Sequence, residues 1–199
     1  MNDDGALAFD VRRTVLLASY IQAWGMPHSR TISEKGNHRV EVYFFPSKDD
    51  DVINRYATIG LSGHVSDTGK VLDWELFMAV PSDNAGATID EIIFFILDVM
   101  AFSQRKDVPF KIGMAFAESP LMPQQWRSRA FLIDEPRAEP ESLSEIKLGS
   151  EVVKLFWIIP IYKNEYEAIR DGGIEKFDKG EAASSWSPAD PSRPSFLND

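Results

Sequence analysis

The chain has 199 residues, 44% of them hydrophobic, and a formal net charge of −10. A chain this long and this apolar can bury enough surface to fold as one large domain without covalent staples. It has no cysteine, which excludes disulfides, thiolate zinc sites, iron–sulfur clusters and a cysteine nucleophile. The negative charge disfavours nucleic acids and anionic membranes as partners. It either favours a basic protein partner or serves only to keep the chain soluble.

The chain start and its most apolar stretch indicate the cellular compartment. The first residues, Met-Asn-Asp-Asp-Gly-Ala, lack the basic start and apolar run of a secretory signal. The most apolar stretch, 92–100, contains Asp98 and is far shorter than the roughly 20 residues that a membrane helix needs. We therefore expect a cytoplasmic protein without a membrane segment.

The first part of the chain predicts one helix and a run of strands. Apolar residues at helical spacing predict a helix over 10–24, which Gly25 ends. Residues 26–38 are rich in Pro, Ser, Gly and Asn, which indicates a loop. Alternating, β-branched and aromatic residues then predict three strands, at 39–45, 56–62 and 71–80. Their short connections favour an antiparallel meander, and Pro46 makes the first of these strands a candidate sheet edge.

The second part predicts two helices and three further strands. Thr88 and Glu91 form a capping-box pair at the start of a strongly apolar helix over 89–103. The remaining elements are short strands at 110–116 and 129–133, an apolar central strand at 152–159, and a helix at 164–171 followed by a helical turn. We expect one α+β domain over 1–180, with a mostly antiparallel or mixed sheet flanked by helices. A loosely ordered tail over 181–199 follows.

Three segments in order along the chain resemble the suppressor-of-fused domain family. Tyr56-Ala-Thr-Ile-Gly-Leu-Ser62 is similar to a family strand with a Thr-x-Gly-Leu/Met-Ser pattern, and Trp74-Glu75-Leu76 resembles the aromatic-Glu-Leu stretch of the next strand. Ile158-Ile-Pro-Ile161, followed by Glu165 and the Gly172-Gly173 stop, looks like the family's closing strand, turn and acidic helix. The tail with Arg193-Pro-Ser-Phe196 is similar to endings of bacterial members.

This resemblance implies an α+β fold, no cofactor and a protein-binding role without catalysis. The animal members are two-part proteins that clasp a transcription-factor peptide between subdomains, and this chain has room for one such part. Bacterial relatives include proteins regarded as immunity proteins in polymorphic toxin systems.

The motif residues can also be understood from the fold alone. Gly60 within a strand indicates a bulge or the close approach of another backbone. Trp74 is expected in the core. Glu75 shares a strand face with Asp73, and Phe77 on the same face would cover it in part. A buried Glu75 would need a partner such as an arginine.

No catalytic motif is complete. His28, His38 and His64 lack metal-ligand spacing, so a metal site built from them has no support. The segment around Ser62 resembles a serine nucleophile elbow, but it ends in His64 instead of Gly and precedes no long helix. Asp49 to Asp51 indicate a solvated turn more than a cation loop. No nucleotide-binding loop is present.

The most acidic segment is 134–151, whose carboxylates outnumber its two cations, Arg137 and Lys147. An acidic face there would suit a basic partner, including a nuclease toxin. The other interpretation is an ordinary acidic loop. The candidate protein-binding residues are Asp134, Glu135, Glu139, Glu141 and Glu145.

Three functions remain open at this point. The first is a non-enzymatic protein-binding module that accepts a partner strand at an exposed sheet edge. The alternative is an immunity protein that neutralises a cognate toxin. The second alternative is an unrecognised hydrolase, which a deep pocket lined by histidines and carboxylates would favour.

Overall fold

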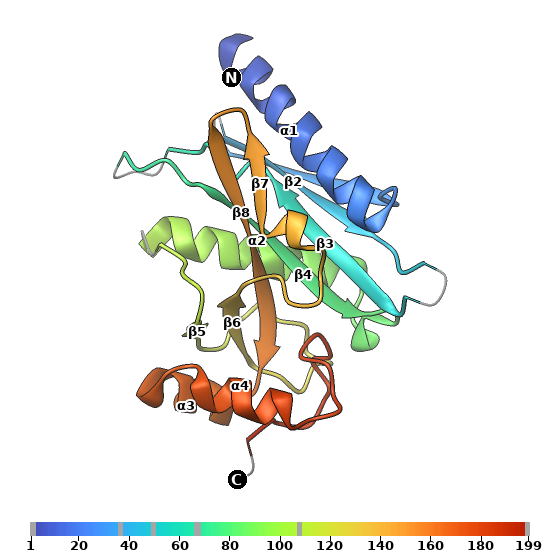
Figure 1. Cartoon of the computed structure of the whole chain (residues 1–199), viewed down its shortest axis with the longest axis vertical. Coiled ribbons are helices and arrows are strands. Elements are labelled where there is room, and N and C mark those ends of the chain that lie inside the picture. The colour runs from blue at the N-terminus through green and yellow to red at the C-terminus, as the bar shows by residue number, and fades with distance from the viewer. Residues whose placement is uncertain (1–2, 36–37, 49–50, 66–68, 107–108, 198–199) are drawn as a thin grey trace. The chain divides into compact units, whose positions relative to one another are not determined.

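The computed structural model describes residues 3–35, 38–48, 51–65, 69–106 and 109–197 (Figure 1). Its helices are α1 (Asp3–Trp24), α2 (Ile89–Lys106), α3 (Lys163–Gly172) and α4 (Glu175–Ala182), with the 3-10 turns η1 (Asn84–Gly86) and η2 (Glu141–Leu143). Its strands are β1 (Ser29–Lys35), β2 (His38–Phe45), β3 (Ile53–Ile59), β4 (Trp74–Pro81), β5 (Met114–Phe116), β6 (Ala130–Asp134), β7 (Glu145–Leu148) and β8 (Glu151–Ile161).

The strands form one eight-stranded sheet within the described ranges. Its order is β1-β2-β3-β4-β8-β6-β5, and β7 pairs with β8 outside this path. The pairs β1–β2, β2–β3, β5–β6, β6–β8 and β7–β8 are antiparallel. The predicted α+β class with a mostly antiparallel sheet is confirmed. The strongly apolar strand predicted at 152–159 is β8, which lies between β4 and β6 as expected for a central strand.

The loop predicted at 26–38 is wrong, because β1 lies within it. β1 pairs with β2 along its length, from Ser29 opposite Phe44 to Glu34 opposite Arg39. Its sequence, Ser-Arg-Thr-Ile-Ser-Glu-Lys, is polar because the strand lies at the sheet edge and has few buried positions. The prediction that 39–45 forms an edge is therefore also wrong, since β2 lies between β1 and β3.

The chain divides into two structural units, each described by itself. Unit 1 comprises Met1–Pro46, Arg55–Phe77 and Glu135–Phe156, and unit 2 comprises Ser47–Asn54, Met78–Asp134 and Trp157–Asp199.

Aromatic side chains of α1 form the core of unit 1 with its strands. The Trp24 ring lies 5.2 Å from the Phe45 ring and 5.8 Å from the Phe77 ring, and Tyr20 stacks on it at 5.1 Å. The Tyr20 hydroxyl donates a hydrogen bond to the Thr58 carbonyl oxygen at 3.2 Å. Large aromatic rings of this kind bury much apolar surface, so they fix α1 against β2, β3 and β4.

The core of unit 2 is built around α2. Phe95 of α2 contacts Phe131 of β6 at 5.8 Å and Trp126 at 6.1 Å, measured between ring centroids. Phe131 in turn stacks on Phe116 of β5 at 5.0 Å. The indole N–H of Trp126 donates to the Asn84 carbonyl at 3.0 Å, which satisfies its one donor.

The predicted capping box of α2 is confirmed. The Thr88 backbone N–H donates to the Glu91 carboxylate at 2.8 Å, and the Glu91 N–H donates to the Thr88 hydroxyl at 3.2 Å. The hydrogen bonds from Thr88, first its backbone N–H and then its hydroxyl, lower the pKa of Glu91. None of the helices in the described ranges is long and apolar enough to span a membrane.

The last residues pack against α3 within unit 2. Arg193 is fully buried, and its guanidinium donates to both Glu165 oxygens, at 2.7 and 2.9 Å. The Ser128 N–H donates to the Pro191 carbonyl at 3.0 Å. The predicted division into a domain over 1–180 and a tail over 181–199 stays a prediction. Within that tail, Arg193 is held at a defined position by its bonds to Glu165.

Candidate functional site

The family-like segment 58–62 forms a cage around the Glu75 carboxylate. Glu75 is fully buried and accepts hydrogen bonds from the backbone N–H groups of Gly60, Leu61 and Ser62, at 3.0, 3.2 and 2.9 Å. The hydroxyls of Thr58 and Ser62 donate at 2.7 and 2.6 Å. Five donors thus replace the water that this carboxylate loses on burial.

This geometry corrects the expectation of an arginine partner for Glu75. Gly60 has a φ of +117°, which turns the chain so that successive N–H groups point at the carboxylate. A Cβ on Gly60 would lie 2.3 Å from the Arg39 carbonyl oxygen, so the predicted close approach of another backbone is present. The charge of Glu75 also reaches Tyr20: burial first, and then this charge, raise the pKa of the Tyr20 hydroxyl well above its ordinary value.

A second buried carboxylate, Glu41 of β2, gathers arginines from three elements. The Arg39 Nε atom donates to it at 2.9 Å, and Arg30 Nη1 of β1 and Arg13 Nη1 of α1 lie 3.4 and 3.7 Å from its oxygens. The Tyr43 hydroxyl donates a further bond. Burial by itself raises the pKa of Glu41, but the bonds from Tyr43 and Arg39 and the arginine charges outweigh it, so the pKa is lowered.

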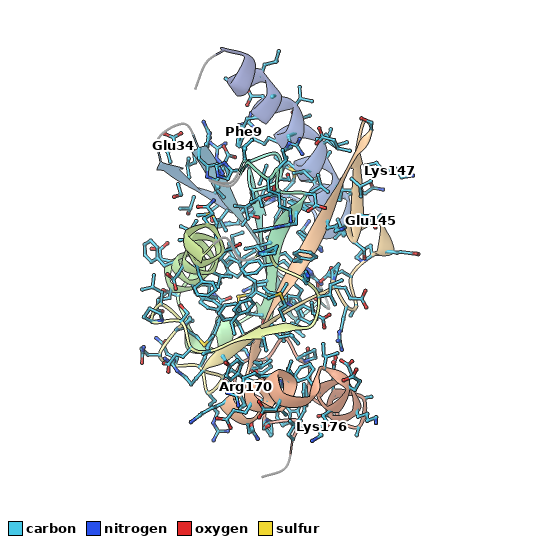
Figure 2. The ribbon with its side chains drawn as sticks, turned by 90° about the vertical axis from the view of Figure 1, so that its left-hand side faces the viewer. Phe9, Glu34, Glu145, Lys147, Arg170 and Lys176 are labelled. Atoms are coloured by element: carbon cyan, nitrogen blue, oxygen red, sulfur yellow. The ribbon has the colours of Figure 1, made fainter. Side chains whose placement is uncertain are left out.

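This arginine cluster lies next to the open edge of the sheet. Arg30 belongs to edge strand β1, and its side chain is 40% exposed. The guanidinium carbon of Arg39 lies over the Phe9 ring, 5.3 Å from its centroid. The Arg39 Nη1 atom is 3.7 Å from Glu34 Oε1, and Figure 2 labels Phe9 and Glu34. The edge strand therefore carries charged side chains, which protect an exposed edge from pairing with another copy.

The five predicted acidic residues do not form one exposed group. Asp134 is buried at the end of β6. The Glu139 carboxylate is 5% exposed and accepts hydrogen bonds at 2.7 Å from both Arg55 and the Trp24 indole. Asp134 is therefore withdrawn from the surface by burial, and Glu139 is engaged by partners inside the fold. The charge excess in 134–151 that pointed to them does not distinguish buried from exposed carboxylates.

The other three acidic residues, Glu135, Glu141 and Glu145, are exposed. Glu145 and Lys147, which is also exposed, lie on β7, and Figure 2 labels both. A binding role for these residues stays a prediction.

The three histidines are only partly brought together. The His38 and His64 rings stack with centroids 3.7 Å apart, and the His38 Nε2 atom lies 3.0 Å from the Gly60 carbonyl oxygen. His28 packs on Phe44 instead, with ring centroids 6.0 Å apart. Among the described residues, no group of three or more His, Cys, Asp or Glu side chains is placed to hold a metal ion.

The serine of the elbow-like segment is also accounted for. Ser62 is 3% exposed, and its hydroxyl donates to Glu75 within the cage. The loop 49–51 falls mostly outside the described residues, since only Asp51 of the three aspartates is described.

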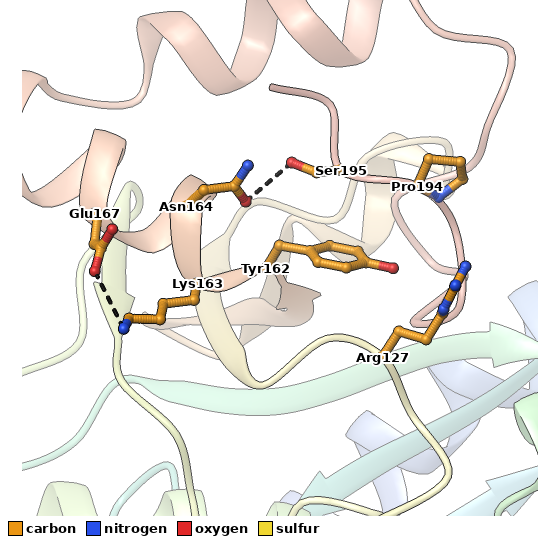
Figure 3. Close-up of a pocket in the computed structure, with 7 residues that line it drawn as sticks. All are labelled: Arg127, Tyr162, Lys163, Asn164, Glu167, Pro194 and Ser195. Atoms are coloured by element: carbon orange, nitrogen blue, oxygen red, sulfur yellow. Dashed lines mark hydrogen bonds and ion pairs between the residues drawn. The ribbon is translucent and has the colours of Figure 1, made fainter. Parts of the chain in front are cut away.

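Unit 2 contains a pocket that the sequence did not indicate (Figure 3). It has a volume of about 540 Å³. Its lining residues come from the loop before β6, the start of α3 and the tail: Arg127, Tyr162, Lys163, Asn164, Glu167, Pro194 and Ser195. No sequence motif indicates this pocket, because its lining residues come from segments that are far apart in the sequence.

Comparisons with solved structures show that the fold is shared. A protein described as a SUFU homolog from Neisseria gonorrhoeae has a TM-score of 0.73 and 18% identity, with 94% of this chain and 98% of that chain covered. A chain of the Sufu–Fu complex has a TM-score of 0.64 and 11% identity, covering 96% and 91%. Drosophila Suppressor of Fused has a TM-score of 0.65 and 12% identity, and this chain, covered to 98%, spans 54% of it.

The sequence comparison identifies the family. No curated protein matches the chain. The family model described as "Suppressor of fused protein (SUFU)" matches residues 36–194, which include the Glu75 cage, the Glu41 carboxylate and the Glu165–Arg193 pair. The chain therefore belongs to the suppressor of fused family.

Proposed function

We propose that the protein is a non-enzymatic module that binds another protein. The observation that carries this proposal is its family membership, because a fold relative was crystallised as the Sufu–Fu complex. The structural roles of Ser62 and Glu75 agree with it, since both polar groups are bonded to each other inside the fold. In this proposal the protein acts in the cytoplasm, without a cofactor, and does not bind nucleic acid.

The proposed contact is strand addition at β1. β1 has seven residues and ends the sheet path, so a partner segment could pair with its free edge through main-chain hydrogen bonds. Ile32 on this strand is 41% exposed and offers an apolar contact. Arg30 beside it offers a charge for the partner's side chains.

Two single proline variants, Thr31→Pro and Ile32→Pro, test this contact. Alternate residues of an edge strand direct their N–H groups to the neighbouring strand or to the open side, so one of the two variants removes an outward donor and leaves the β1–β2 pairing in place. Wild type and both variants are used as bait in a native lysate, and the retained proteins are identified by mass spectrometry. The folded proline variant is expected to lose the partner that the wild type retains.

Far-UV circular dichroism identifies the variant that keeps its fold. A partner retained equally by that folded variant would contradict strand addition at β1. Recovery of no protein partner by the wild type at any salt concentration would contradict the protein-binding function itself.

We propose the immunity role as the second candidate, because Glu135, Glu141 and Glu145 are exposed in unit 1. Such carboxylates would accelerate association with a basic toxin. A triple variant of these residues to Gln should slow association and weaken its salt dependence. A matched triple variant, Asp90→Asn, Asp171→Asn and Glu175→Gln, changes net charge equally at other exposed positions. Equal effects of both triple variants, or no toxin gene next to this one, would count against the role.

A further inference from the structure

Hydrogen bonds connect the segments that line the pocket of unit 2. The Tyr162 backbone N–H donates to Glu165 at 2.8 Å, and the Tyr162 hydroxyl donates to the Arg193 carbonyl. Ser195 donates to the Asn164 side-chain oxygen at 3.0 Å. These bonds connect the first turn of α3 to the tail, and residues of both segments line the pocket.

Arg127 is the unpaired charge of this pocket. In the described part of the chain it forms no hydrogen bond and no ion pair, whereas Arg129 pairs with Glu118 and Arg193 with Glu165. Its exposed side chain rises from a fixed backbone, because Trp126 and Ser128 on either side are 2% and 0% exposed. A guanidinium without an internal partner can bind an oxyanion through two N–H donors.

The other two charged side chains of the lining do not pair with Arg127. Glu165, which accepts the Tyr162 N–H, is neutralised by buried Arg193. Lys163 and Glu167 lie 3.8 Å apart and offset each other. Figure 3 shows this pair on one side of the Tyr162 ring and Arg127 on the other, beyond the hydroxyl end. Burial raises the pKa of the Tyr162 hydroxyl. The charges of Arg127 and Arg193 act against this rise, and those of Glu165 and Asp190 add to it.

The remaining lining is suited to an apolar body. The Tyr162 ring lies in the middle of the pocket and Pro194 forms its wall near Arg127 (Figure 3). The volume of about 540 Å³ is much larger than a bare phosphate or carboxylate requires and falls in the usual range for small-molecule sites.

We propose that this pocket binds a small organic oxyanion whose ring or flat apolar part packs on Tyr162 and Pro194 and whose anionic group pairs with Arg127. The anionic group is a carboxylate or a phosphate, because both present oxygen pairs that match a guanidinium. This site is separate from the proposed protein contact at β1, so either can fail without the other.

Titration calorimetry with benzoate and phenyl phosphate tests the proposal. The two probes share a ring and differ in the anionic group, so their relative affinities distinguish a carboxylate ligand from a phosphate ligand. The wild type should bind at least one of them saturably, and Arg127→Gln should weaken that binding about tenfold or more, since a charge-assisted pair is lost. Arg127→Lys should bind with intermediate affinity, because lysine keeps the positive charge but lacks the two parallel N–H donors of the guanidinium.

The matched control is Arg170→Gln. It removes an exposed arginine of α3 that does not line the pocket, so binding should stay within about twofold of wild type. Absence of saturable binding by the wild type up to about 10 mM of either probe overturns the proposal. So does an equal loss in the Arg127 and Arg170 variants, which would show only general attraction to positive charge.

Discussion

Three glutamates among the described residues are fully buried, and their charges are satisfied in two different ways. Glu41 and Glu165 are paired with arginines, whereas Glu75 is bonded to backbone N–H groups and hydroxyls. A buried carboxylate without such partners would cost several kcal/mol. The Thr-x-Gly-Leu-Ser segment is thus explained by its bonds to Glu75, with no role in catalysis required.

Replacing Glu75 with glutamine should destabilise the protein strongly. The new amide group would point a donor at a cage that consists of donors, so at least one buried N–H or hydroxyl loses its acceptor. We expect a loss of about 3 kcal/mol in the free energy of unfolding. Urea denaturation measures it, with exposed Glu145→Gln as the control that should change little. Equal midpoints for the two variants would contradict the role of the cage.

The position of Gly60 makes a second prediction at this scale. Gly60→Ala would place a Cβ 2.3 Å from the Arg39 carbonyl oxygen at a φ of +117°, so we expect a cost of about 2–4 kcal/mol. Gly149 also has a positive φ, +62°, but a Cβ there meets nothing within 4 Å. Gly149→Ala should therefore cost only about 1–2 kcal/mol. Thermal unfolding of both variants measures these losses of stability. Similar losses in the two variants would argue against a steric clash at Gly60.

Glu41 should make the stability of the protein decrease at low pH. Its pKa is lowered in the folded protein, so its contribution is complete above the ordinary glutamate value of 4.5 and is lost as the pH falls through the lowered value. Glu41→Gln should therefore be less stable than wild type at pH 7, and the difference should narrow as the pH falls below 4.5. Urea titrations at several pH values measure this. A difference that is constant with pH would contradict it.

At the scale of elements, the sheet shows why one strand was missed. β1 has a polar sequence and few buried positions, yet it pairs with β2 over seven residues. Its conformation therefore depends on the neighbouring strand more than on its own residues. An edge strand of this kind is also the element most open to a partner.

Helix α2 provides a prediction at the same scale. Thr88→Ala removes the hydroxyl that accepts the Glu91 N–H, so the thermal midpoint should fall by about 2–4 °C. Thr14→Ala in α1 is the matched control. Among the described residues, the Thr14 hydroxyl bonds only back to the Asp10 carbonyl. Alanine is the better helix former, so the thermal midpoint of Thr14→Ala should not fall. A drop for Thr14→Ala as large as for Thr88→Ala would contradict a stabilising role of the cap.

At the scale of the molecule, the end of the chain is part of the fold of unit 2. Arg193 lies 28 residues after its partner Glu165, and its guanidinium carbon is 3.6 Å from the centre of the Phe196 ring. The tail is therefore held by a buried charge pair together with aromatic packing. It also supplies Pro194 and Ser195 to the pocket.

Arg193→Met should accordingly destabilise the protein. It leaves Glu165 buried without its cation, which costs about 3–5 kcal/mol. Arg170→Met breaks an exposed pair with Asp171 and should leave the midpoint unchanged. Urea unfolding measures both, and limited proteolysis should cut the tail faster in the first variant. Equal proteolysis of wild type and Arg193→Met would show that the tail does not depend on this pair.

The sequence by itself determined the α+β class, most of the strands and helices, the α2 capping box and the family. These follow from local periodicity, turn residues and the order of short motifs, all of which are contiguous in the chain. Gly60 was likewise recognisable as a close backbone approach, because a glycine inside a strand commonly marks a bulge or a neighbouring backbone in near contact.

Only the tertiary structure decided which polar residues are buried and with what they pair. Glu75 bonds to backbone N–H groups, Glu139 is bound by Arg55 and Trp24, and Arg127 faces a pocket without a partner among the described residues. The partners of Glu139 lie 84 and 115 residues away in the sequence, and the pocket joins three distant segments. Such pairings depend on how the chain folds back on itself, which the charge pattern of a single segment does not reveal.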